Sequence, residues 1–314
     1  MATIAKLTFG QHMGVWLQLV RLPFLANVVA PFVLGSALAW RLAGVFDPVN
    51  FILGALAAAL IAASANTMGE VFDVEGDAVG EKTRNKFSGG TLLIHRGIIA
   101  RGEVFAGGVT LAAAAASLGV IICFVRGAGW VPVILGGFGI TSGFFYSTRP
   151  FAWGARGVGE LMIAVCYGWI AVAAAYYIQV GSFVPAVHWL SLPASLSILG
   201  VIYINQFPDY PADKAVGRRN WVVRLGLERS ASVYGIVSLL TAAALPVSVW
   251  RTGLSPWAYL LVLPIFFLAL VNGFLVAVKG AWRDHAALEK VCGNQILINI
   301  GSSLLLTFAV LLFY

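Results

Sequence analysis

Two acidic stretches, 136 residues apart, contain the residue types in this sequence that could do chemistry. They are NTMGEVFDVEGD, which ends at Asp77, and NQFPDYPAD, which ends at Asp213. Each stretch places a D-x-x-x-D pair, beginning at Asp73 and at Asp209, after a long apolar run in a chain with only 13 acids. A spacing of four residues puts both carboxylates of a pair on one face of a helix. We therefore expect two similar helix ends that present carboxylates to a common space.

Other oxygen-bearing side chains extend each pair. If the helix continues through the first stretch, Asn66 and Glu70 lie on the same stripe as its two aspartates. Asn205 lies one helical turn before the second pair. Clustered carboxylates at the edge of an apolar segment repel one another unless a cation lies between them. Mg²⁺ takes oxygen ligands, usually one or two carboxylates together with substrate phosphates, so these residues predict a magnesium site.

Basic residues follow both acidic stretches. The segment EKTRNKFSGG contains Lys82, Arg84 and Lys86 and ends in a Ser-Gly-Gly turn whose backbone N–H groups could face an anion. Positive side chains here can neutralise a diphosphate, whose charge must be stabilised if a C–O bond is to break. An apolar cavity behind the acids would accept a hydrocarbon tail. The predicted ligand is a lipid diphosphate; the alternative is a solvated basic loop that serves only membrane topology.

The elements that must position these residues are membrane-spanning helices. A mean hydropathy of +0.89 and 11% charged residues are typical of polytopic membrane proteins. We predict an all-α bundle of nine transmembrane helices around a central cavity. The nine apolar runs cover residues 22–40, 51–70, 104–125, 129–147, 159–180, 186–207, 230–250, 257–278 and 292–313.

Further expectations concern the ends and the internal symmetry of the bundle. Residues 10–20 are expected to form a short interfacial helix before the first span. Pro208 and Pro211 are expected to kink or break the sixth span around its acidic motif. We expect one domain over residues 1–314, with two pseudo-repeat halves at about 22–147 and 159–278 followed by a last helix.

The basic residues orient this bundle. With a cytoplasmic amino terminus, 17 of the 20 lysines and arginines fall on the cytoplasmic side, including Lys6, and only Arg41, Arg126 and Arg251 fall outside. This asymmetry follows the positive-inside rule and places both acidic motifs at the cytoplasmic face. Topology also accounts for the net charge of +7, so no nucleic-acid partner is needed.

These motifs resemble those of the UbiA superfamily of intramembrane prenyltransferases. The resemblance rests on the NxxxDxxxD-like motifs in spans two and six, the basic loop after each, and the nine spans. It covers nearly the whole chain, through RLPFLANVVAPFVLGSALA, FSGG, YSTRPFAWGARGVGE and NQFPDYPADKAVGRRNWVVRLG. The last two segments are most similar to the 1,4-dihydroxy-2-naphthoate prenyltransferases of the menaquinone branch. One departure is Gly69, where the first motif of the family usually has Asn; Asn66 or Glu70 could substitute.

The resemblance implies Mg²⁺-dependent transfer of a polyprenyl group from a polyprenyl diphosphate to an aromatic quinone precursor, in a bacterial or archaeal cell membrane. It implies that Tyr146 and Phe207 offer aromatic faces to an allylic cation. The implied metal ligands and catalytic residues are Asp73, Asp77, Asp209 and Asp213, with Asn205. The implied substrate-binding residues are Asn66, Glu70, Lys82, Arg84, Tyr146, Arg149 and Lys214.

Other functions fit the same residues. Within the superfamily the acceptor could be 4-hydroxybenzoate, homogentisate, a tetrapyrrole or a glycerol-phosphate lipid. A secondary transporter also contains internal repeats, although transporter sites tend to lie near the membrane midplane rather than at helix ends. A non-catalytic assembly factor is a third alternative. Tail length, metal count and oligomeric state are left open by the sequence.

Overall fold

The computed structural model describes residues 8–314, and every regular element in that range is a helix. Eight helical segments are long and apolar enough to cross a membrane, and α6 is a shorter apolar helix of 17 residues, so the expected nine spans are confirmed for this part of the chain. Their bounds are Leu22–Ala43 (η1 and α2), Pro48–Phe72 (α3), Arg101–Val125 (α5 and η3), Val131–Ser147 (α6), Gly159–Val180 (α8, η4 and α9), Pro185–Ala215 (α10), Leu227–Thr252 (α12), Trp257–Ala277 (α13) and His285–Phe313 (α14). Lys6 lies outside the described residues.

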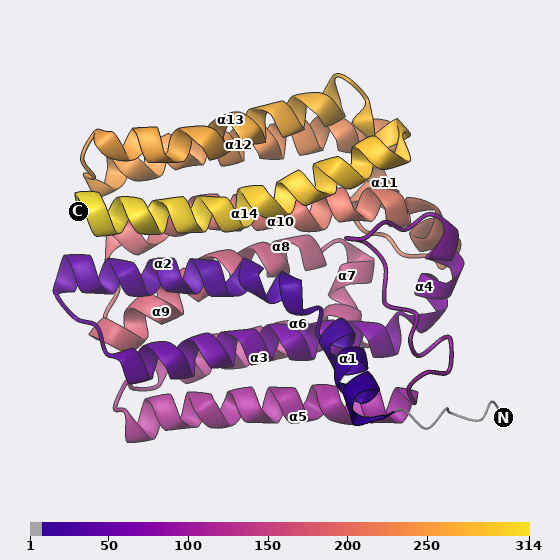
Figure 1. Ribbon diagram of the computed structural model, residues 1–314, viewed down its shortest axis with the longest axis horizontal. Coiled ribbons are helices and arrows are strands. Elements are labelled where there is room, and N and C mark those ends of the chain that lie inside the picture. The colour runs from indigo at the N-terminus through magenta and orange to yellow at the C-terminus, as the bar shows by residue number, and fades with distance from the viewer. Residues whose placement is uncertain (1–7) are drawn as a thin grey trace.

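The long helices run side by side along one direction (Figure 1). Helix α10 packs against both α12 and α14, and α3 packs against α5 and α6. The short helices α4 (Val74–Val79), α7 (Trp153–Arg156) and α11 (Trp221–Leu225) gather at one end of the bundle. The 3₁₀ turns η2 (Gly80–Lys82) and η5 (Ala281–Arg283) complete the order of elements. The ends of α3 and α10 that carry the acidic motifs therefore lie at the same end of the molecule.

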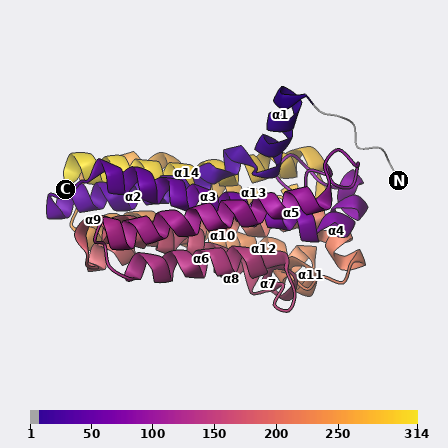
Figure 2. The same ribbon diagram turned by 90° about the horizontal axis from the view of Figure 1, so that it is seen from below.

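Helix α1 (Phe9–Leu19) forms where a short interfacial helix is expected, and it projects from the bundle (Figure 2). It begins with a capping box in which Thr8 and Gln11 satisfy each other's backbone N–H groups. Leu19 is buried against the segment that precedes α5, while Phe9 and Met13 are exposed. This arrangement gives α1 one face for the protein and one apolar face free to enter a membrane surface.

Helix α3 does not continue through the first acidic stretch, so the condition for a single stripe from Asn66 to Asp77 is not met. It begins at Pro48, where Asp47 caps two backbone N–H groups, and it ends at Phe72. Asp73 leaves the helical conformation, with φ −100° and ψ 6°, and α4 begins at the next residue. The break is stabilised by tertiary contacts: Asp73 turns toward α6, and Asp77 on α4 reaches the backbone of a following loop.

Helix α10, in contrast, continues through Pro208 and Pro211, so the expected break in the helix is not found. A proline inside a helix leaves the carbonyl four residues earlier without its usual donor. In α10 a neighbouring helix supplies replacements: Ser248 Oγ donates to the Trp189 carbonyl, freed by Pro193, at 2.6 Å. The Cys292 thiol lies 4.0 Å from the carbonyl that Pro208 frees. Side chains of this kind allow proline in membrane helices.

A buried polar network joins α10, α12, α13 and α14. The Tyr234 hydroxyl donates to Gln295 Oε1 at 2.6 Å and accepts from Asn272 Nδ2 at 2.8 Å. Gln295 Nε2 donates to the Ser197 carbonyl at 2.8 Å, and Asn294 Nδ2 donates to Asn272 Oδ1 at 3.2 Å. Because apolar contacts alone discriminate poorly between helices in lipid, these bonds help fix which helices pack together.

Tyr234→Phe removes the hydroxyl at the centre of this network and leaves Asn272 and Gln295 each short of a partner. We expect a loss of about 1 kcal/mol in unfolding free energy, the usual size of such a bond in a membrane helix bundle. Unfolding of the purified protein in mixed micelles would measure it. Tyr259→Phe is the control, since that hydroxyl has no protein partner among the described residues; equal effects of the two changes would contradict the role of the network.

Candidate active site

A cavity of about 330 Å³ lies between α2, α3, α6, η4 and α10. Helix α3 lines it with small or apolar side chains at helical spacing: Gly54, Ala58, Ile61, Ala65 and Gly69. This stripe is about 22 Å long at 1.5 Å per residue. The lining is mostly apolar along this length and becomes acidic at one end. The cavity therefore has the shape and polarity to hold a long apolar chain with a charged head.

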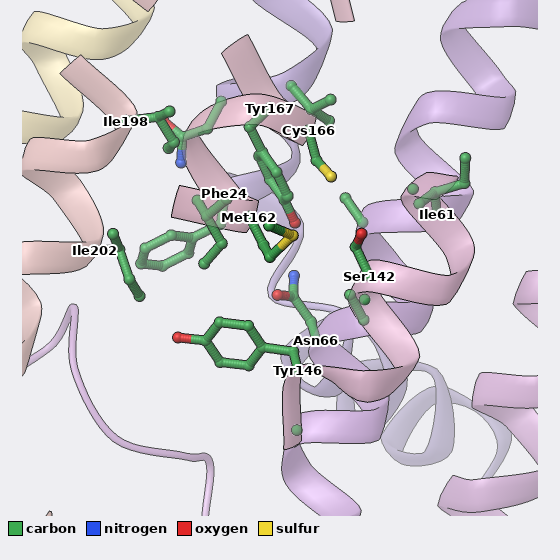
Figure 3. Close-up of a pocket in the computed structure, with 18 of the residues that line it drawn as sticks. Phe24, Ile61, Asn66, Ser142, Tyr146, Met162, Cys166, Tyr167, Ile198 and Ile202 are labelled. Atoms are coloured by element: carbon green, nitrogen blue, oxygen red, sulfur yellow. The ribbon is translucent and has the colours of Figure 1, made fainter. Parts of the chain in front are cut away.

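Irregular helix geometry shapes the middle of the cavity. The segment Ala164–Ile170 (η4) is a π-helical turn, in which an extra residue widens the helix. Cys166 and Tyr167 in this turn, with Ile61 from α3 and Ser142 from α6, lie around a common space in Figure 3. Gly168 contacts the backbone of α10 so closely that a Cβ atom could not fit. This turn, which sequence reasoning missed, brings η4 against α10 and directs side chains into the cavity.

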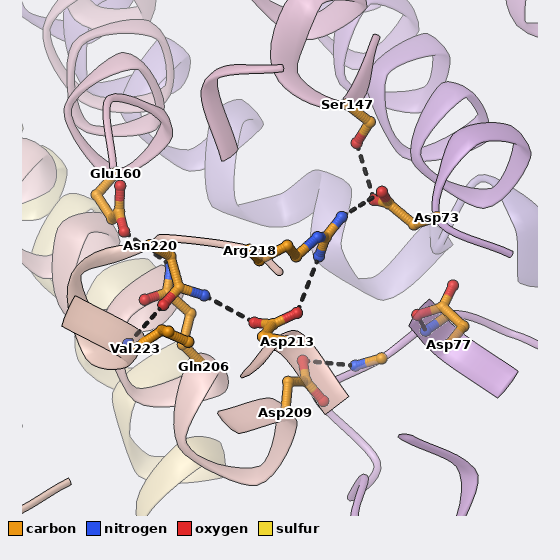
Figure 4. Close-up of polar contacts among 12 residues, drawn as sticks. Asp73, Asp77, Ser147, Glu160, Gln206, Asp209, Asp213, Arg218, Asn220 and Val223 are labelled. Atoms are coloured by element: carbon orange, nitrogen blue, oxygen red, sulfur yellow. Dashed lines mark hydrogen bonds and ion pairs between the residues drawn. The ribbon is translucent and has the colours of Figure 1, made fainter. Parts of the chain in front are cut away.

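Both acidic motifs meet at the polar end of this cavity. Asp73 and Asp77 come from the end of α3 and from α4, and Asp209 and Asp213 come from the last turns of α10. Arg218, in the loop after α10, forms ion pairs with Asp73 and, at 3.2 Å, with Asp213 (Figure 4). The structure thus brings together the two motifs, which are far apart in sequence, with one arginine between them.

Each of the bridged carboxylates has a further donor. Asp73 Oδ2 accepts from Ser147 Oγ at 2.8 Å, and Asp213 Oδ2 accepts from Asn220 Nδ2 at 2.7 Å. Although burial disfavours its charge, Asp73 and Asp213 raise the pKa of Arg218 above its ordinary value. Arg218 is therefore a permanent cation at the centre of the acidic cluster.

A glycine-containing loop, Ser88–Thr91, lies against the same carboxylates, and we call it the strap. The Gly89 N–H donates to Asp209 Oδ2 at 3.1 Å, and the Gly90 N–H donates to Asp77 Oδ1 at 2.8 Å. A Cβ atom at Gly90 would overlap the Asp77 carboxylate, so the close approach requires glycine. The backbone N–H groups of the expected Ser-Gly-Gly turn do face anions, but these are carboxylates of the protein itself.

The strap is held at its end and on its carbonyl side as well. The Thr91 N–H and hydroxyl both donate to Glu70, at 2.9 Å and 2.7 Å. The carbonyl of Gly89 accepts from Arg21, and the carbonyl of Gly90 accepts from Arg84. Glu70 is only 6% exposed, and both of its carboxylate oxygens accept from the Thr91 N–H. Glu70 therefore fixes the position of the loop that reaches both motifs.

Asp77 has an unusual electrostatic environment. Burial, with the nearby charges of Asp73 and Glu70, raises the pKa of the Asp77 carboxyl to about 7, well above its ordinary value. Each cause disfavours an additional negative charge in the site. A bound cation would remove this penalty, so the cluster has the electrostatic character of a site for a positive ion.

Not every residue predicted for substrate binding lies at this cavity. Tyr146, Asn66 and Glu70 line it. Asn205 also lines it, with an Oδ1 atom that is buried and has no hydrogen-bond partner in the described part of the chain. Arg84 lines a small adjoining pocket. Three of the predicted substrate-binding residues are exposed and do not line the cavity: Lys82, Arg149 and Lys214. Phe207 is also outside it and packs in a core cluster with Tyr203.

The positive charge at the cavity comes instead from Arg21 and Arg218. Arg21 lies in the RLPF segment that opens the first span, where it starts η1 with a positive φ of 53°. Arg218 follows the second motif by five residues. In the sequence, both arginines were assigned only to the basic residues that set membrane topology. Neither lies at helical spacing from a motif, so their position beside the carboxylates could be seen only in the folded structure.

Comparisons with known proteins agree with this architecture. Residues 28–288 match the UbiA prenyltransferase family. The 2-carboxy-1,4-naphthoquinone phytyltransferase of Synechocystis sp. is 29% identical over 79% of this chain and 78% of its own length. The 1,4-dihydroxy-2-naphthoate octaprenyltransferase of Escherichia coli is 27% identical over 67% of this chain and 68% of its own length.

Solved structures share the fold. A UbiA homologue from Aeropyrum pernix superposes with a TM-score of 0.69 at 15% identity, over 91% of this chain and 96% of that one. A UbiA homologue from Archaeoglobus fulgidus bound to DMAPP and Mg²⁺ superposes with a TM-score of 0.57 at 18% identity, over 94% of this chain and 98% of that one. The resemblance seen in the sequence is thus confirmed, and the chain belongs to the UbiA prenyltransferase family, as an integral membrane prenyltransferase.

Proposed function

We propose that this protein transfers a polyprenyl group from a polyprenyl diphosphate to an aromatic quinone precursor, 1,4-dihydroxy-2-naphthoate, with Mg²⁺ as the cofactor. The observation that carries the proposal is the meeting of both acidic motifs and two arginines at one end of a long apolar cavity. Two naphthoate or naphthoquinone prenyltransferases among the relatives support the acceptor, and the homologue bound to DMAPP and Mg²⁺ supports the donor and the metal.

The residues present fit a magnesium ion shared with a substrate. The candidate ligands are all oxygen donors: Asp73, Asp77, Asp209 and Asp213, with the unpartnered Oδ1 of Asn205 beside them. Within the described part of the chain, no three acidic, histidine or cysteine side chains are grouped so that they could hold an ion. Mg²⁺ commonly takes only one or two carboxylates and completes its shell with phosphate oxygens and water. When bound, it would stabilise the negative charge that develops on the departing diphosphate.

The other residues of the site would bind and orient the donor. The guanidinium groups of Arg21 and Arg218 can each donate two parallel hydrogen bonds to phosphate oxygens. The stripe on α3 from Gly54 to Gly69 would hold the prenyl chain away from water. When the allylic C–O bond breaks, the diphosphate leaves with the electron pair, and the ring of Tyr146 at the cavity offers a π-face to the resulting cation. The electron-rich ring of the acceptor then attacks the allylic carbon, and the attacked ring carbon loses its substituent, as a proton or as CO2 from a carboxylate, so that the ring becomes aromatic again.

We also propose that the end of the bundle with the acidic motifs faces the cytoplasm, in a bacterial or archaeal cell membrane. The strongest support is the concentration of lysine and arginine in the loops of that end, as the positive-inside rule requires. The motif-bearing helices α3 and α10 each stand second in their half of the chain, which agrees with two pseudo-repeat halves.

The acceptor is tested by product identification. We would incubate the purified protein with Mg²⁺, a labelled polyprenyl diphosphate and a panel of 1,4-dihydroxy-2-naphthoate, 4-hydroxybenzoate, homogentisate and a glycerol-phosphate lipid. We expect a prenylated naphthoate-derived product by mass spectrometry, with one diphosphate released per product. Prenylation of another acceptor alone would show the acceptor assignment to be wrong. Donor binding with no release of diphosphate would indicate a transporter instead.

Asp73→Asn and Asp209→Asn should each lower kcat by about 100-fold or more, because a proposed metal ligand contributes several kcal/mol of charge stabilisation. Glu75→Gln is the matched control: Glu75 lies between the two aspartates of the first motif, but its side chain is exposed. Steady-state turnover with a fixed donor would be measured for all three. Turnover in Asp209→Asn equal to that of the control would contradict the assignment and favour a non-catalytic role.

Ala58→Phe places a large ring in the distal part of the α3 stripe, about 16 Å from Gly69 at 1.5 Å per residue. We expect the variant to retain turnover with a short prenyl diphosphate and to lose most turnover with a long one, because the ring fills space that the distal part of the chain needs. Leu56→Phe, on the exposed face of the same helix, is the control. The ratio of kcat/KM for geranyl and octaprenyl diphosphate is the measurement, and an unchanged ratio in Ala58→Phe would place the chain elsewhere.

A further inference from the structure

Building on the proposed function, we propose that the free site is neutralised by its own residues, so that metal ion and diphosphate bind cooperatively, with Arg218 as the residue that couples them. In the free protein, groups suited to a diphosphate are already paired with groups suited to a metal ion. Neither ligand can then bind well without the other. The reasoning rests on how the donors and the carboxylates are paired.

The clearest of these pairings are the ion pairs that Arg218 forms with two aspartates. The guanidinium contacts Asp73 from the first motif and Asp213 from the second, so one side chain holds together segments that are over 100 residues apart. The Arg218 N–H donates to the Asp213 carbonyl at 2.9 Å, which ties the arginine to the end of α10. The arginine side chain is 25% exposed, and that of Asp213 is 8% exposed. The ion pair with Asp213 is therefore only partly screened by water.

The strap repeats the same pairing with backbone groups. Two consecutive N–H groups that could cradle a phosphate donate instead to Asp209 and Asp77. Because the carbonyls of the same two glycines accept from Arg21 and Arg84, the strap is held in this position. All four aspartates proposed as metal ligands are thus engaged by a donor suited to phosphate.

Because of this pairing, binding one ligand alone is less favourable in free energy than binding both ligands together. A divalent ion alone would have to displace Arg218 from its carboxylates and would leave that cation uncompensated beside it. A diphosphate alone would meet four carboxylates and would have to separate the same pairs. When both are present, the carboxylates turn to the metal and the guanidinium and N–H groups turn to the phosphate oxygens. Each charge then keeps a partner.

Such a difference is a coupling free energy, and it must be reciprocal. We expect diphosphate to raise the affinity for the metal, and the metal to raise the affinity for diphosphate, by the same factor. Typical couplings between sites are about 5- to 150-fold. The lack of a group of three potential ligands for an ion in the described residues agrees with weak binding of metal alone.

The experiment measures binding, not turnover. Full-length protein in lipid nanodiscs would be titrated with Mn²⁺ as a paramagnetic probe, with and without inorganic diphosphate, and with diphosphate at zero and saturating Mn²⁺. We expect at least about a tenfold gain in each direction for the unmodified protein. In Arg218→Gln, we expect tighter binding of Mn²⁺ alone, weaker binding of diphosphate, and a coupling factor several-fold smaller.

Arg219→Gln is the matched control, because this neighbouring arginine is exposed and its side chain has no ion-pair partner in the described part of the chain. It should keep the coupling of the unmodified protein. If Arg218→Gln does not fold, Arg218→Met, which keeps an unbranched, flexible apolar stem without the charge, takes its place. The titrations of the unmodified protein test the coupling without any substitution.

The outcomes separate this inference from the proposed function. Independent binding of Mn²⁺ and diphosphate to the unmodified protein would overturn the inference and leave the function standing. Equal coupling in Arg218→Gln and Arg219→Gln would overturn the role of Arg218. Failure of Mn²⁺ and diphosphate to bind under any condition, together or alone, would count against the proposed function itself.

Discussion

Mutual repulsion among four carboxylates is the constraint on which this structure depends. Helices α3 and α10 bring the two D-x-x-x-D pairs to one end of an apolar cavity, where water is scarce and unpaired charge is costly. The protein meets this cost with Arg218 and with the backbone N–H groups of the strap. The break after α3, the glycines of the strap and the loop after α10 all serve contacts to these four side chains.

Much of the fold follows from the sequence because membrane helices are set by local hydropathy. All nine spans were predicted within several residues, and both motifs were assigned to span ends. What could not be predicted depends on tertiary partners. The end of α3 at Phe72 reflects contacts that Asp73 and Asp77 make elsewhere. The continuity of α10 relies on a side chain of α12 at Pro193 and on one of α14 at Pro208. Local propensity carries no information about such partners.

The same distinction applies to the site. The carboxylates were found because acids at helical spacing in an apolar chain are conspicuous. Among the basic residues, proximity to a motif along the chain was a poor guide: Lys82 and Lys214 are exposed, whereas Arg21 lies at the cavity. The position of a long basic side chain in a loop depends on the path of the folded backbone, not on its distance along the sequence from a motif. Glu70, which lines the cavity as predicted for a substrate-binding residue, also holds the strap, a contact that a sequence without its fold could not show.

The π-helical turn of η4 also constrains how the chain tolerates change in length. A π turn holds one residue more than an α turn, and each helical residue turns the chain by about 100°. Deleting one residue between Ala164 and Ile170 would let the segment relax into a regular helix, in which the flanking turns keep nearly their present orientation but the side chains of the π turn point in new directions. Cys166 or Tyr167 would then swing out of the cavity, or Gly168 would lose its contact with α10. Insertions and deletions should be excluded from this turn, although the loops at either end of the bundle can accept them.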